Sequence, residues 1–329
     1  MDAERIRFFL PEEKKEEKHA ADKEKTYELI IVGGGPAGLT AAVYSARKAI
    51  DTLLLTKDIG GQILLTQEVE NYMGYQYIGG KELIEKFKQH VQRFPVAMKE
   101  KTEVVRITND EKTFTVETRD GESYHAKTVI IAAGKRPRPL NAKGEKELVG
   151  KGVTYCSVCD APLFSGQNVA VIGGGNSGLT AVVDLIKIAK KIYLIESFPS
   201  LRADAVLVEK AERSDKVEKF LGYEVLEVLG RGRVENIKIK PKQKDETKTL
   251  PVTGVLIEIG LIPNSYLAKD LVKLNDFQEI LVDCACRTSV PGVFAAGDVT
   301  TVPEKQIVVA AGEGAKAALS CYNYLLGLR

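Results

Sequence analysis

The clearest pattern in the chain is a repeated succession of an apolar strand, a glycine-rich turn and an alanine-rich helix. One copy begins at Tyr27 and reads YELIIVGGGPAGLTAAVYSARKA, and the other begins at Asn168 and reads NVAVIGGGNSGLTAVVDLIKIA. A second apolar strand follows each copy. The two glycine motifs start 140 residues apart, at Gly33 and Gly173. This duplication predicts an α/β fold with two Rossmann-like, three-layer ββα nucleotide-binding domains.

Strand-rich sequence follows each repeat, and two segments that contain Gly-x-x-Pro interrupt it. They read AAGKRPRP at 132–139 and EIGLIPN at 258–264. We expect the chain to leave the first domain at the former segment and to return at the latter. The prediction is a charged arm, a discontinuous first domain and an inserted second domain, with the boundaries 1–26, 27–137 with 264–329, and 138–263.

Composition and charge narrow the class of protein. The 329 residues are 44% hydrophobic and 28% charged, which fits a globular core and excludes a disordered, fibrous or disulfide-stapled secreted chain. The near balance of 47 basic and 45 acidic residues argues against broad nucleic-acid binding. No apolar run approaches the about 18 residues that a membrane span needs, and no signal peptide is recognised. We therefore expect a cytoplasmic protein that binds neither nucleic acid nor membrane.

The first glycine motif has the G-x-G-x-x-G spacing of a dinucleotide site. Gly33 makes the tight turn, Gly35 lets the backbone approach a pyrophosphate, and Gly38 lets the helix pack on the strand. The start of the helix then provides a positive field for the phosphates. A glycine turn can also end a strand for structural reasons alone. The strand before the motif and the helix after it favour dinucleotide binding.

The second motif repeats this spacing at Gly173, Gly175 and Gly178. Glu196 ends the following strand, 23 residues beyond the first glycine, close to the about 20 expected for an acid that binds a ribose. A carboxylate there accepts hydrogen bonds from a 2′,3′-diol and repels a 2′-phosphate. The alternative is a solvent-exposed strand end without a ligand.

Near the C-terminus, the segment VFAAGDV at 293–299 is a strand that ends in Ala-Gly-Asp. It would place a buried carboxylate, Asp298, where a polyhydroxylated cofactor could bind. The alternative is an aspartate that caps the next turn. The segment QIVVAAGEGAKAA at 306–318 predicts a small-residue helix close to that cofactor, with its start able to stabilise negative charge.

A C-x-x-C pair, Cys156 and Cys159, lies just before the second glycine motif, and Asp160 follows it. Such a pair forms a small redox-active disulfide ring, and the aspartate could carry the proton released when the ring opens. The alternatives are half of a zinc site or an inert pair. The sequence contains no second C-x-x-C, and its three histidines are scattered, so we expect no metal site.

The remaining cysteines are assigned no chemistry. We expect Cys284 and Cys286 to alternate along a strand and to point to the same face, and Cys321 to pack in an apolar helix.

Together these residues resemble the low-molecular-weight thioredoxin reductase family from about Tyr27 to the C-terminus. The shared stretches include GGQ at 60–62, ENY at 70–72, GVTYCSVCDAPLF at 152–164 and TSVPGVFAAGD at 288–298. The stretches IGGGNSG at 172–178 and TTVPEKQIVVAAGEGAKAALS at 300–320 are similar to the flavoprotein subunit of alkyl hydroperoxide reductase. That subunit carries an additional N-terminal thioredoxin-fold module. Because this chain has the charged arm there, we do not expect a complete peroxidase-reducing subunit.

The resemblance implies a thioredoxin reductase-like fold, a homodimer and a set of site residues. It implies that Cys159 faces the flavin, that Cys156 attacks the disulfide of a partner, and that Asp160 is the acid-base group. It implies FAD at Gly33, Gly35, Pro36, Ala37, Gly38, Gly61, Gln62, Asn71, Asp298, Gln306 and Ile307. It implies a nicotinamide dinucleotide at Gly173, Gly175, Asn176, Ser177, Gly178, Glu196 and Arg202.

The segment after Glu196 departs from the family pattern. Members that use NADPH carry H-R-R-x-x-x-R, whereas this chain has Ser197 and Phe198 in place of two arginines, and only Arg202 matches. This difference favours NADH over NADPH. The expected activity is that of a thioredoxin-disulfide reductase, with electrons passing from NADH through FAD and the cysteine pair to a thioredoxin-like or glutaredoxin-like protein, or to a peroxiredoxin system.

Two other functions remain open on the sequence. One keeps the disulfide chemistry and replaces NADH with reduced ferredoxin or a deazaflavin. The other is a flavin redox sensor whose cysteine pair changes conformation without turnover.

Overall fold

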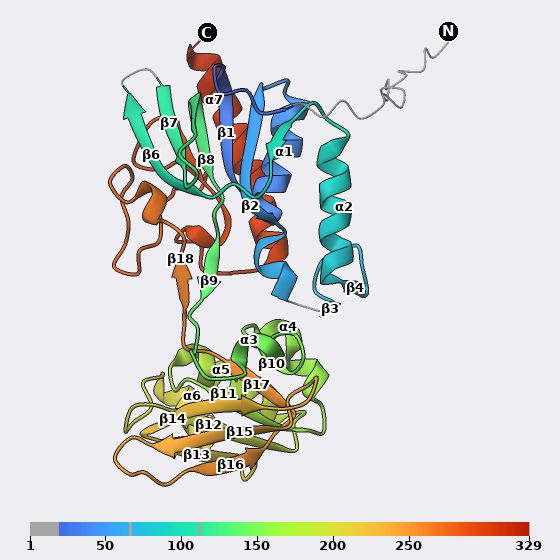
Figure 1. Ribbon diagram of the computed structural model, residues 1–329, viewed down its shortest axis with the longest axis vertical. Helices are drawn as coiled ribbons and strands as arrows, with labels where there is room; N and C mark the ends of the chain where they lie inside the picture. Colours follow the sequence, from blue (N-terminus) through green and yellow to red (C-terminus); the bar gives the residue numbers. More distant parts are fainter. Residues whose placement is uncertain (1–19, 66–67, 111–112, 329) are drawn as a thin grey trace.

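The computed structural model describes residues 20–65, 68–110 and 113–328. Within these ranges it does not describe the side chains of Leu65, Glu68, Val158 and Cys159. Most of the expected N-terminal arm, 1–26, therefore lies outside the described residues. The two large sheets lie in two bodies that β9 and β18 connect (Figure 1), and we call these bodies the first and the second unit.

The first unit contains a seven-stranded sheet in the order β5-β2-β1-β8-β7-β6, with β19 beside β8. The parallel part of the sheet consists of β5, β2, β1, β8 and β19. The antiparallel part consists of two pairs, β8 with β7 and β7 with β6. The strands are β1 (Thr26–Gly34), β2 (Thr52–Ile59), β5 (Ala97–Lys99), β6 (Val104–Asp110), β7 (Thr113–Thr118), β8 (Ser123–Ile131) and β19 (Val293–Ala295). A small antiparallel pair, β3 (Glu68–Val69) and β4 (Ile78–Gly79), lies outside the sheet.

Alternate side chains of β1 point to opposite faces of this sheet, as the pleat of a strand requires. Leu29 and Ile31 are fully buried against the helical face, while Ile30 and Val32 belong to the core on the other face. The helices are α1 (Pro36–Arg47), α2 (Gly80–Gln92) and α7 (Ile307–Leu328). Helix α7 comes from the end of the chain and packs on α1, so the first unit is discontinuous in sequence.

The second unit contains a parallel five-stranded sheet in the order β10-β17-β11-β12-β13. Its strands are β10 (Val153–Thr154), β11 (Asn168–Ile172), β12 (Lys191–Glu196), β13 (Val217–Leu221) and β17 (Gly254–Ile257). An antiparallel sheet of β14 (Tyr223–Leu229), β15 (Asn236–Pro241) and β16 (Lys248–Pro251) packs on one side. The helices are α3 (Glu145–Leu148), α4 (Ser157–Asp160), α5 (Asn176–Ile186) and α6 (Ala205–Glu212).

The two units are connected by a short antiparallel ribbon. It consists of β9 (Lys135–Pro137) and β18 (Leu261–Pro263), which are the two Gly-x-x-Pro segments of the sequence. Asn264 fastens the ribbon to the first unit, because its side-chain amide donates to the carbonyl of Ala133 at 2.8 Å and its oxygen accepts from Arg136 at 2.7 Å. Both passages of the chain between the units therefore lie side by side.

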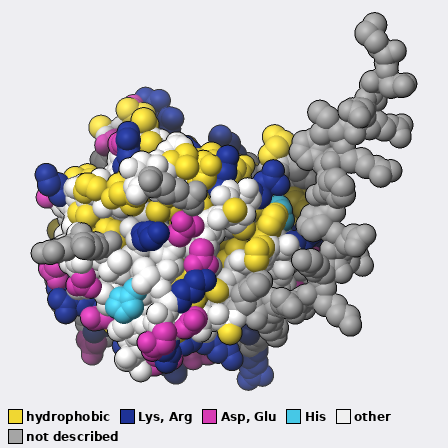
Figure 2. Space-filling model, turned by 90° about the horizontal axis from the view of Figure 1, so that it is seen from above, with side chains coloured by type: hydrophobic (Ala, Val, Ile, Leu, Met, Phe, Trp, Pro, Cys, Tyr) yellow, Lys and Arg dark blue, Asp and Glu magenta, His cyan; other side chains and the backbone are white. Residues whose placement is uncertain are grey.

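Short helical turns complete the structure: η1 (Gly61–Leu65), η2 (Ala161–Phe164), η3 (Tyr266–Ala268) and η4 (Gly297–Val299). None of the helices in the described ranges is long and apolar enough to cross a membrane. On the face shown in Figure 2, basic and acidic side chains are interspersed and do not gather in a patch of one sign.

The expectation for Cys284 and Cys286 is wrong. The segment is a turn in which Cys284 is exposed and Cys286 is buried with a φ of 62°. The turn forms because the Asp283 side chain accepts hydrogen bonds from the amides of Ala285 and Arg287, both at 2.9 Å. Cys321 is fully buried in α7, as predicted, with its sulfur 3.1 Å from the Thr128 hydroxyl.

One carboxylate of the first unit connects three of its elements. Glu103 accepts two hydrogen bonds from Arg119, at 2.7 and 3.0 Å, and one from the Tyr266 hydroxyl at 3.1 Å. Lys57 lies 3.3 Å away. The Arg119 hydrogen bonds, with those of Tyr266 and Lys57, lower the pKa of Glu103 from 4.5 to about 2.

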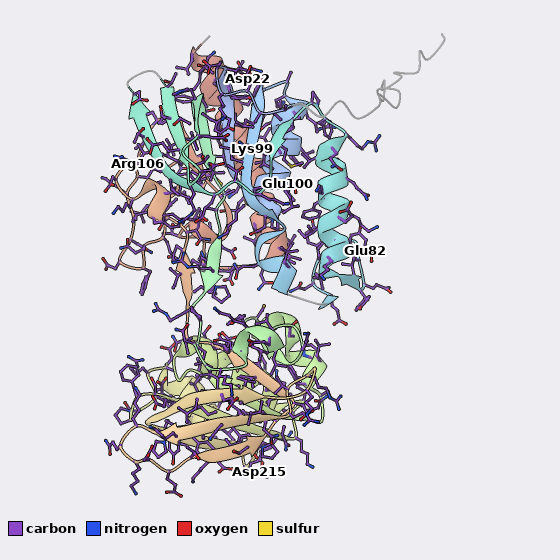
Figure 3. The ribbon with its side chains drawn as sticks, viewed as in Figure 1. Asp22, Glu82, Lys99, Glu100, Arg106 and Asp215 are labelled. Atoms are coloured by element: carbon purple, nitrogen blue, oxygen red, sulfur yellow. The ribbon has the colours of Figure 1, made fainter. Side chains whose placement is uncertain are left out.

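A lowered pKa in the folded state means that Glu103 stabilises the fold above pH 4.5 and loses this effect as the pH falls toward about 2. We predict that the melting temperature of the wild type falls more steeply over this interval than that of Glu103→Gln. The control is Glu82→Gln on the outward side of α2 (Figure 3), where the carboxylate has one lysine partner at 3.3 Å. Parallel melting curves for wild type and Glu103→Gln would contradict the prediction.

Candidate functional site

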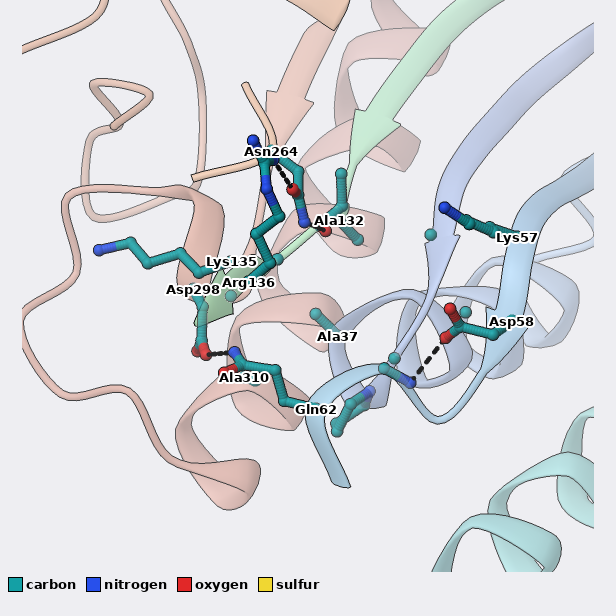
Figure 4. Close-up of a pocket in the computed structure, with 18 of the residues that line it drawn as sticks. Ala37, Lys57, Asp58, Gln62, Ala132, Lys135, Arg136, Asn264, Asp298 and Ala310 are labelled. Carbon is teal, nitrogen blue, oxygen red and sulfur yellow. Dashed lines mark hydrogen bonds between the residues drawn. The ribbon is translucent and has the colours of Figure 1, made fainter. Parts of the chain in front are cut away.

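A cavity of about 850 Å³ lies at the carboxyl ends of the parallel strands of the first unit (Figure 4). Its lining includes the start of α1, the turn after β2, the beginning of β9, the η4 turn and the start of α7. Most of the residues that the sequence assigned to FAD line it: Gly33, Gly35, Pro36, Ala37, Gly61, Gln62, Asp298, Gln306 and Ile307. The structure therefore brings together residues from the two ends of the discontinuous first unit.

The three glycines of the first motif differ in what surrounds them. A Cβ atom on Gly33, where φ is +114°, would lie 2.3 Å from the carbonyl oxygen of Ala132, and one on Gly38 would lie 1.8 Å from that of Gly33. At Gly35, no described atom lies within 4 Å of the corresponding position. Gly33 and Gly38 are thus required by the fold, whereas Gly35 leaves open space at the start of α1.

Polar groups around the cavity suit a dinucleotide that carries hydroxyl groups. Asp298 is half-buried and accepts a hydrogen bond of 2.9 Å from the side chain of Gln62 across the cavity. Burial raises the pKa of Asp298. Asn71 does not line the cavity, but its amide donates to the side chain of Gln306 at 3.1 Å. The open backbone at Gly35 and the Asp298 acceptor together fit FAD.

Sequence reasoning missed a cluster of charged residues at one end of the cavity. Lys135 and Lys305 both line the cavity and share the carboxylate of Glu279, with Lys305 at 3.5 Å from it. Burial and the nearby Lys135 lower the pKa of Lys305. Lys135 lies in the predicted crossing segment and Lys305 directly precedes Gln306, but only folding brings them together.

The cysteine turn of the second unit reaches the same cavity. Cys156 lines it together with Thr154 and Tyr155, and Cys156 is disulfide-bonded. The other cysteines with described side chains, Cys284, Cys286 and Cys321, are free. Cys159 belongs to α4, but its side chain lies outside the described residues. Cys156 of the second unit therefore lines the same cavity as the first glycine motif of the first unit.

Asp160 is buried one turn beyond Cys156. Its carboxylate accepts a hydrogen bond from the Thr154 hydroxyl, and the same hydroxyl oxygen accepts from the backbone amide of Cys156 at 3.1 Å. Asp160 is thus connected to the cysteine through one threonine. This position is compatible with the expected acid-base role.

The second glycine motif reproduces the geometry of the first. A Cβ atom on Gly178 would lie 1.9 Å from the carbonyl oxygen of Gly173, and one on Gly173 would lie 2.3 Å from that of Glu258. At Gly175, no described atom lies within 4 Å. The side chain of Asn176 is hydrogen-bonded to the side chain and the backbone amide of Asp204, the residue before α6.

Glu196 is buried, with 5% of its surface exposed, so the alternative of a solvent-exposed strand end is wrong. Its carboxylate accepts hydrogen bonds from the backbone amides of Gly174, at 2.5 Å, and Phe198, at 2.9 Å. The guanidinium carbon of Arg202 lies 3.6 Å from the centre of the Phe198 ring. Glu196 therefore holds the glycine loop, and Arg202 is stacked on the residue that replaces a family arginine.

The described residues contain no group of three or more His, Cys, Asp or Glu side chains that could hold a metal ion.

Comparisons with known proteins agree with this arrangement. The model of the family described as pyridine nucleotide-disulphide oxidoreductase matches residues 27–314. The chain is 43% identical to a subunit of the alkyl hydroperoxide reductase of Pseudomonas putida, over 92% of this chain and 59% of the relative. It is 39% identical to a protein named NADH dehydrogenase of Bacillus subtilis (strain 168), over 93% and 60%. The chain thus spans about three fifths of these curated relatives.

Among solved structures, the chain is similar to the thioredoxin reductase of Streptococcus pyogenes MGAS5005. The TM-score is 0.86 at 36% identity, and the match covers 92% of this chain and 99% of that one. The fold is therefore the predicted thioredoxin reductase-like α/β fold.

The different surroundings of Gly35 and Gly38 allow a matched test. We predict that Gly38→Ala lowers the free energy of unfolding by about 1–3 kcal/mol, because its Cβ atom would overlap the backbone. Gly35→Ala should keep the stability of the protein without flavin and weaken FAD binding, because its methyl group enters the open space. Thermal melting of the flavin-free protein and titration with FAD measure the two effects. Equal effects of both variants on both quantities would contradict this division.

Proposed function

The chain belongs to the pyridine nucleotide-disulphide oxidoreductase family, and we propose that it is an FAD-dependent reductase that carries electrons from NADH to a Cys156–Cys159 disulfide and on to a thioredoxin-like protein. The observation that carries the proposal is the position of Cys156, which is disulfide-bonded and lines the cavity of the first glycine motif. We assign FAD binding to 27–137 with 264–329, and nicotinamide binding to 138–263.

The roles of the protein groups follow from their positions. Bound FAD would supply a carrier for two electrons between the nicotinamide and the disulfide. The start of α1 would hold its pyrophosphate, and Asp298 with Gln62 would orient a hydroxylated part of the molecule. Lys135 and Lys305 would place positive charge beside it.

The reaction balances with two electrons and two protons. NADH gives up a hydride, which contains two electrons and one proton, and the second proton comes from solvent. Opening the disulfide consumes both electrons and both protons and yields two thiols. Asp160, connected to Cys156 through Thr154, would hold or transfer the proton at the sulfur.

The cysteine pair and the second glycine motif lie in the same unit, so the flavin must meet them in turn. In the arrangement described, Cys156 faces the flavin cavity. Rotation about the β9–β18 ribbon would bring the nicotinamide to the same place. The ribbon suits this motion because both chain passages between the units lie side by side there.

The names of the relatives suggest which class of protein accepts the electrons. Alkyl hydroperoxide reductase subunits and thioredoxin reductases are similar to this chain, so a thioredoxin-like, glutaredoxin-like or peroxiredoxin-linked acceptor is proposed. We also propose a homodimer in the cytoplasm, as the family resemblance implies. Size-exclusion chromatography with light scattering tests the dimer.

We predict that Cys156→Ser and Cys159→Ser each abolish NADH-dependent reduction of thioredoxin while FAD stays bound. Each variant leaves one sulfur, which cannot form the internal disulfide. Cys284→Ser is the matched control, because Cys284 is exposed and free, and it should keep full turnover. Turnover by either of the first two variants would sink the assignment. Absence of turnover in the wild type, with the flavin still reduced by NADH, would favour the sensor.

We predict that NADH has the higher kcat/KM, by roughly ten- to several-hundred-fold over NADPH. The 2′-phosphate of NADPH would lie near the Glu196 carboxylate. It would also find no arginine at the two positions where NADPH-using members of the family have one. Replacing Ser197 and Phe198 together with arginine should shift the preference toward NADPH, and the double alanine variant at the same positions controls for the loss of the Phe198 ring. Equal kcat/KM values in the wild type would contradict the role of Glu196. If neither NADH nor NADPH reduces the flavin, the result would favour reduced ferredoxin or a deazaflavin as the electron donor.

A further inference from the structure

Glu258 lies between the two reactive parts of the second unit, and sequence reasoning assigned it no role. It directly follows β17, and its amide donates to the carbonyl of Ile172 at the end of β11, at 2.8 Å. Its own carbonyl oxygen would lie 2.3 Å from a Cβ atom on Gly173. The backbone of Glu258 is therefore packed against the first glycine of the second motif.

The side chain of Glu258 points to the cysteine turn. Its Oε1 accepts a hydrogen bond of 3.1 Å from the backbone amide of Ser157, the residue that follows Cys156. Ser157 is buried. The same carboxylate therefore anchors the start of α4, directly after the redox cysteine.

The carboxylate also interacts with the second motif itself. Burial raises the pKa of Glu258, and hydrogen bonds from the Ser177 hydroxyl, the Ser157 hydroxyl and the Ser157 amide oppose this rise. Ser177 lies between the second and third glycines of the motif, in the first turn of α5. One side chain thus interacts with the cysteine turn and with the segment that would hold a pyrophosphate.

We propose that Glu258 is a positioning residue that couples the dinucleotide site at the second glycine motif to the redox equilibrium of Cys156. The inference rests on the proposed function, because it assigns the coupled sites their ligand and their chemistry. A negative charge at Glu258 disfavours a thiolate in the adjoining turn and disfavours the pyrophosphate at the start of α5. A phosphate that accepts the hydrogen bond of the Ser177 hydroxyl would leave the Glu258 carboxylate hydrogen-bonded to the cysteine turn alone.

The test compares Glu258→Gln with Glu145→Gln in the FAD-loaded protein under anaerobic conditions. Glutamine has nearly the shape of glutamate and keeps an oxygen acceptor for Ser157, but it removes the charge. Glu145 is buried in the same unit and accepts hydrogen bonds from the amides of Leu140 and Asn141, at 2.9 and 2.7 Å, and from the hydroxyl of Tyr155, the residue before Cys156, at 2.7 Å. It therefore controls for the loss of a buried charge near the cysteine turn. It has no described contact with the second motif.

Two quantities are measured, and neither requires turnover. The first is the equilibrium in which reduced dithiothreitol and the protein disulfide give oxidised dithiothreitol and the protein dithiol, at a pH at which part of that dithiol is ionised to thiolate. The reaction is quenched with acid, and the protein thiols are then counted by alkylation. The second is the Kd of ADP-ribose, which contains the pyrophosphate but cannot reduce the flavin. We expect Glu258→Gln to raise the first equilibrium constant and to tighten ADP-ribose binding, each by about three- to tenfold. Glu145→Gln should leave the Kd of ADP-ribose unchanged.

Unchanged values in Glu258→Gln, or a change in only one of the two quantities, would overturn the inference. So would equal changes in Glu145→Gln, because they would reflect a general loss of packing. Failure of the proposed function would show differently, as a wild-type protein that forms a reversible Cys156 disulfide but transfers no electrons from NADH to any disulfide acceptor.

Discussion

Helices α1 and α5 begin in direct backbone contact with the strand that precedes them, and the rest of the structure depends on this contact. The third glycine of each motif faces the carbonyl oxygen of the first, and an added Cβ atom would come within 1.8 Å at Gly38 and 1.9 Å at Gly178. Each helix is thereby held over the carboxyl end of its sheet, with its first amides toward the edge where a ligand enters. At Gly35 and Gly175 the corresponding space is open on the described structure. With any residue larger than glycine at the third position of the motif, the side chain would overlap the carbonyl oxygen of the first glycine. The helix could then not begin so close to the strand, and its first amides could not reach a ligand at this edge.

The β9–β18 ribbon sets a second constraint, because it decides which side of the second unit meets the first. Asn264 joins the ribbon to the first unit because it is hydrogen-bonded to both Arg136 and Ala133, and all three residues line the cavity. Lys135, the first residue of β9, also lines that cavity. The ribbon therefore lies next to the site where the flavin is expected. Cys156 and the ribbon residues Lys135 and Arg136 line the same cavity even though Cys156 belongs to the second unit.

The sequence was informative wherever a function depends on residues that are close along the chain. The spacing of Gly33, Gly35 and Gly38 predicted the strand–turn–helix geometry, because the backbone itself imposes the glycines. Contacts between residues that are far apart along the chain could not be predicted in this way. Glu258 contacts Ser157 across 101 positions, and Lys135 contacts Glu279 across 144. The strand predicted for Cys284 and Cys286 failed for a local reason, because hydrogen bonds to the Asp283 side chain stabilise a turn that the alternation of residues does not reveal.

The two glycine sites share their backbone but differ in the charges that surround it. Two largely buried lysines, Lys135 and Lys305, line the cavity at the first site. At the second site, carboxylates interact with the loop itself, with Glu196 bonded to Gly174 and Glu258 next to Gly173. Cations strengthen the binding of a pyrophosphate at a helix start, and carboxylates weaken it. The two copies therefore differ in the charged groups nearest to them: a lysine pair bridged by Glu279 lines the first cavity, whereas two carboxylates contact the second glycine loop. Under the proposed function, this difference suits an FAD that stays bound through many turnovers and a nicotinamide dinucleotide that must leave after each one.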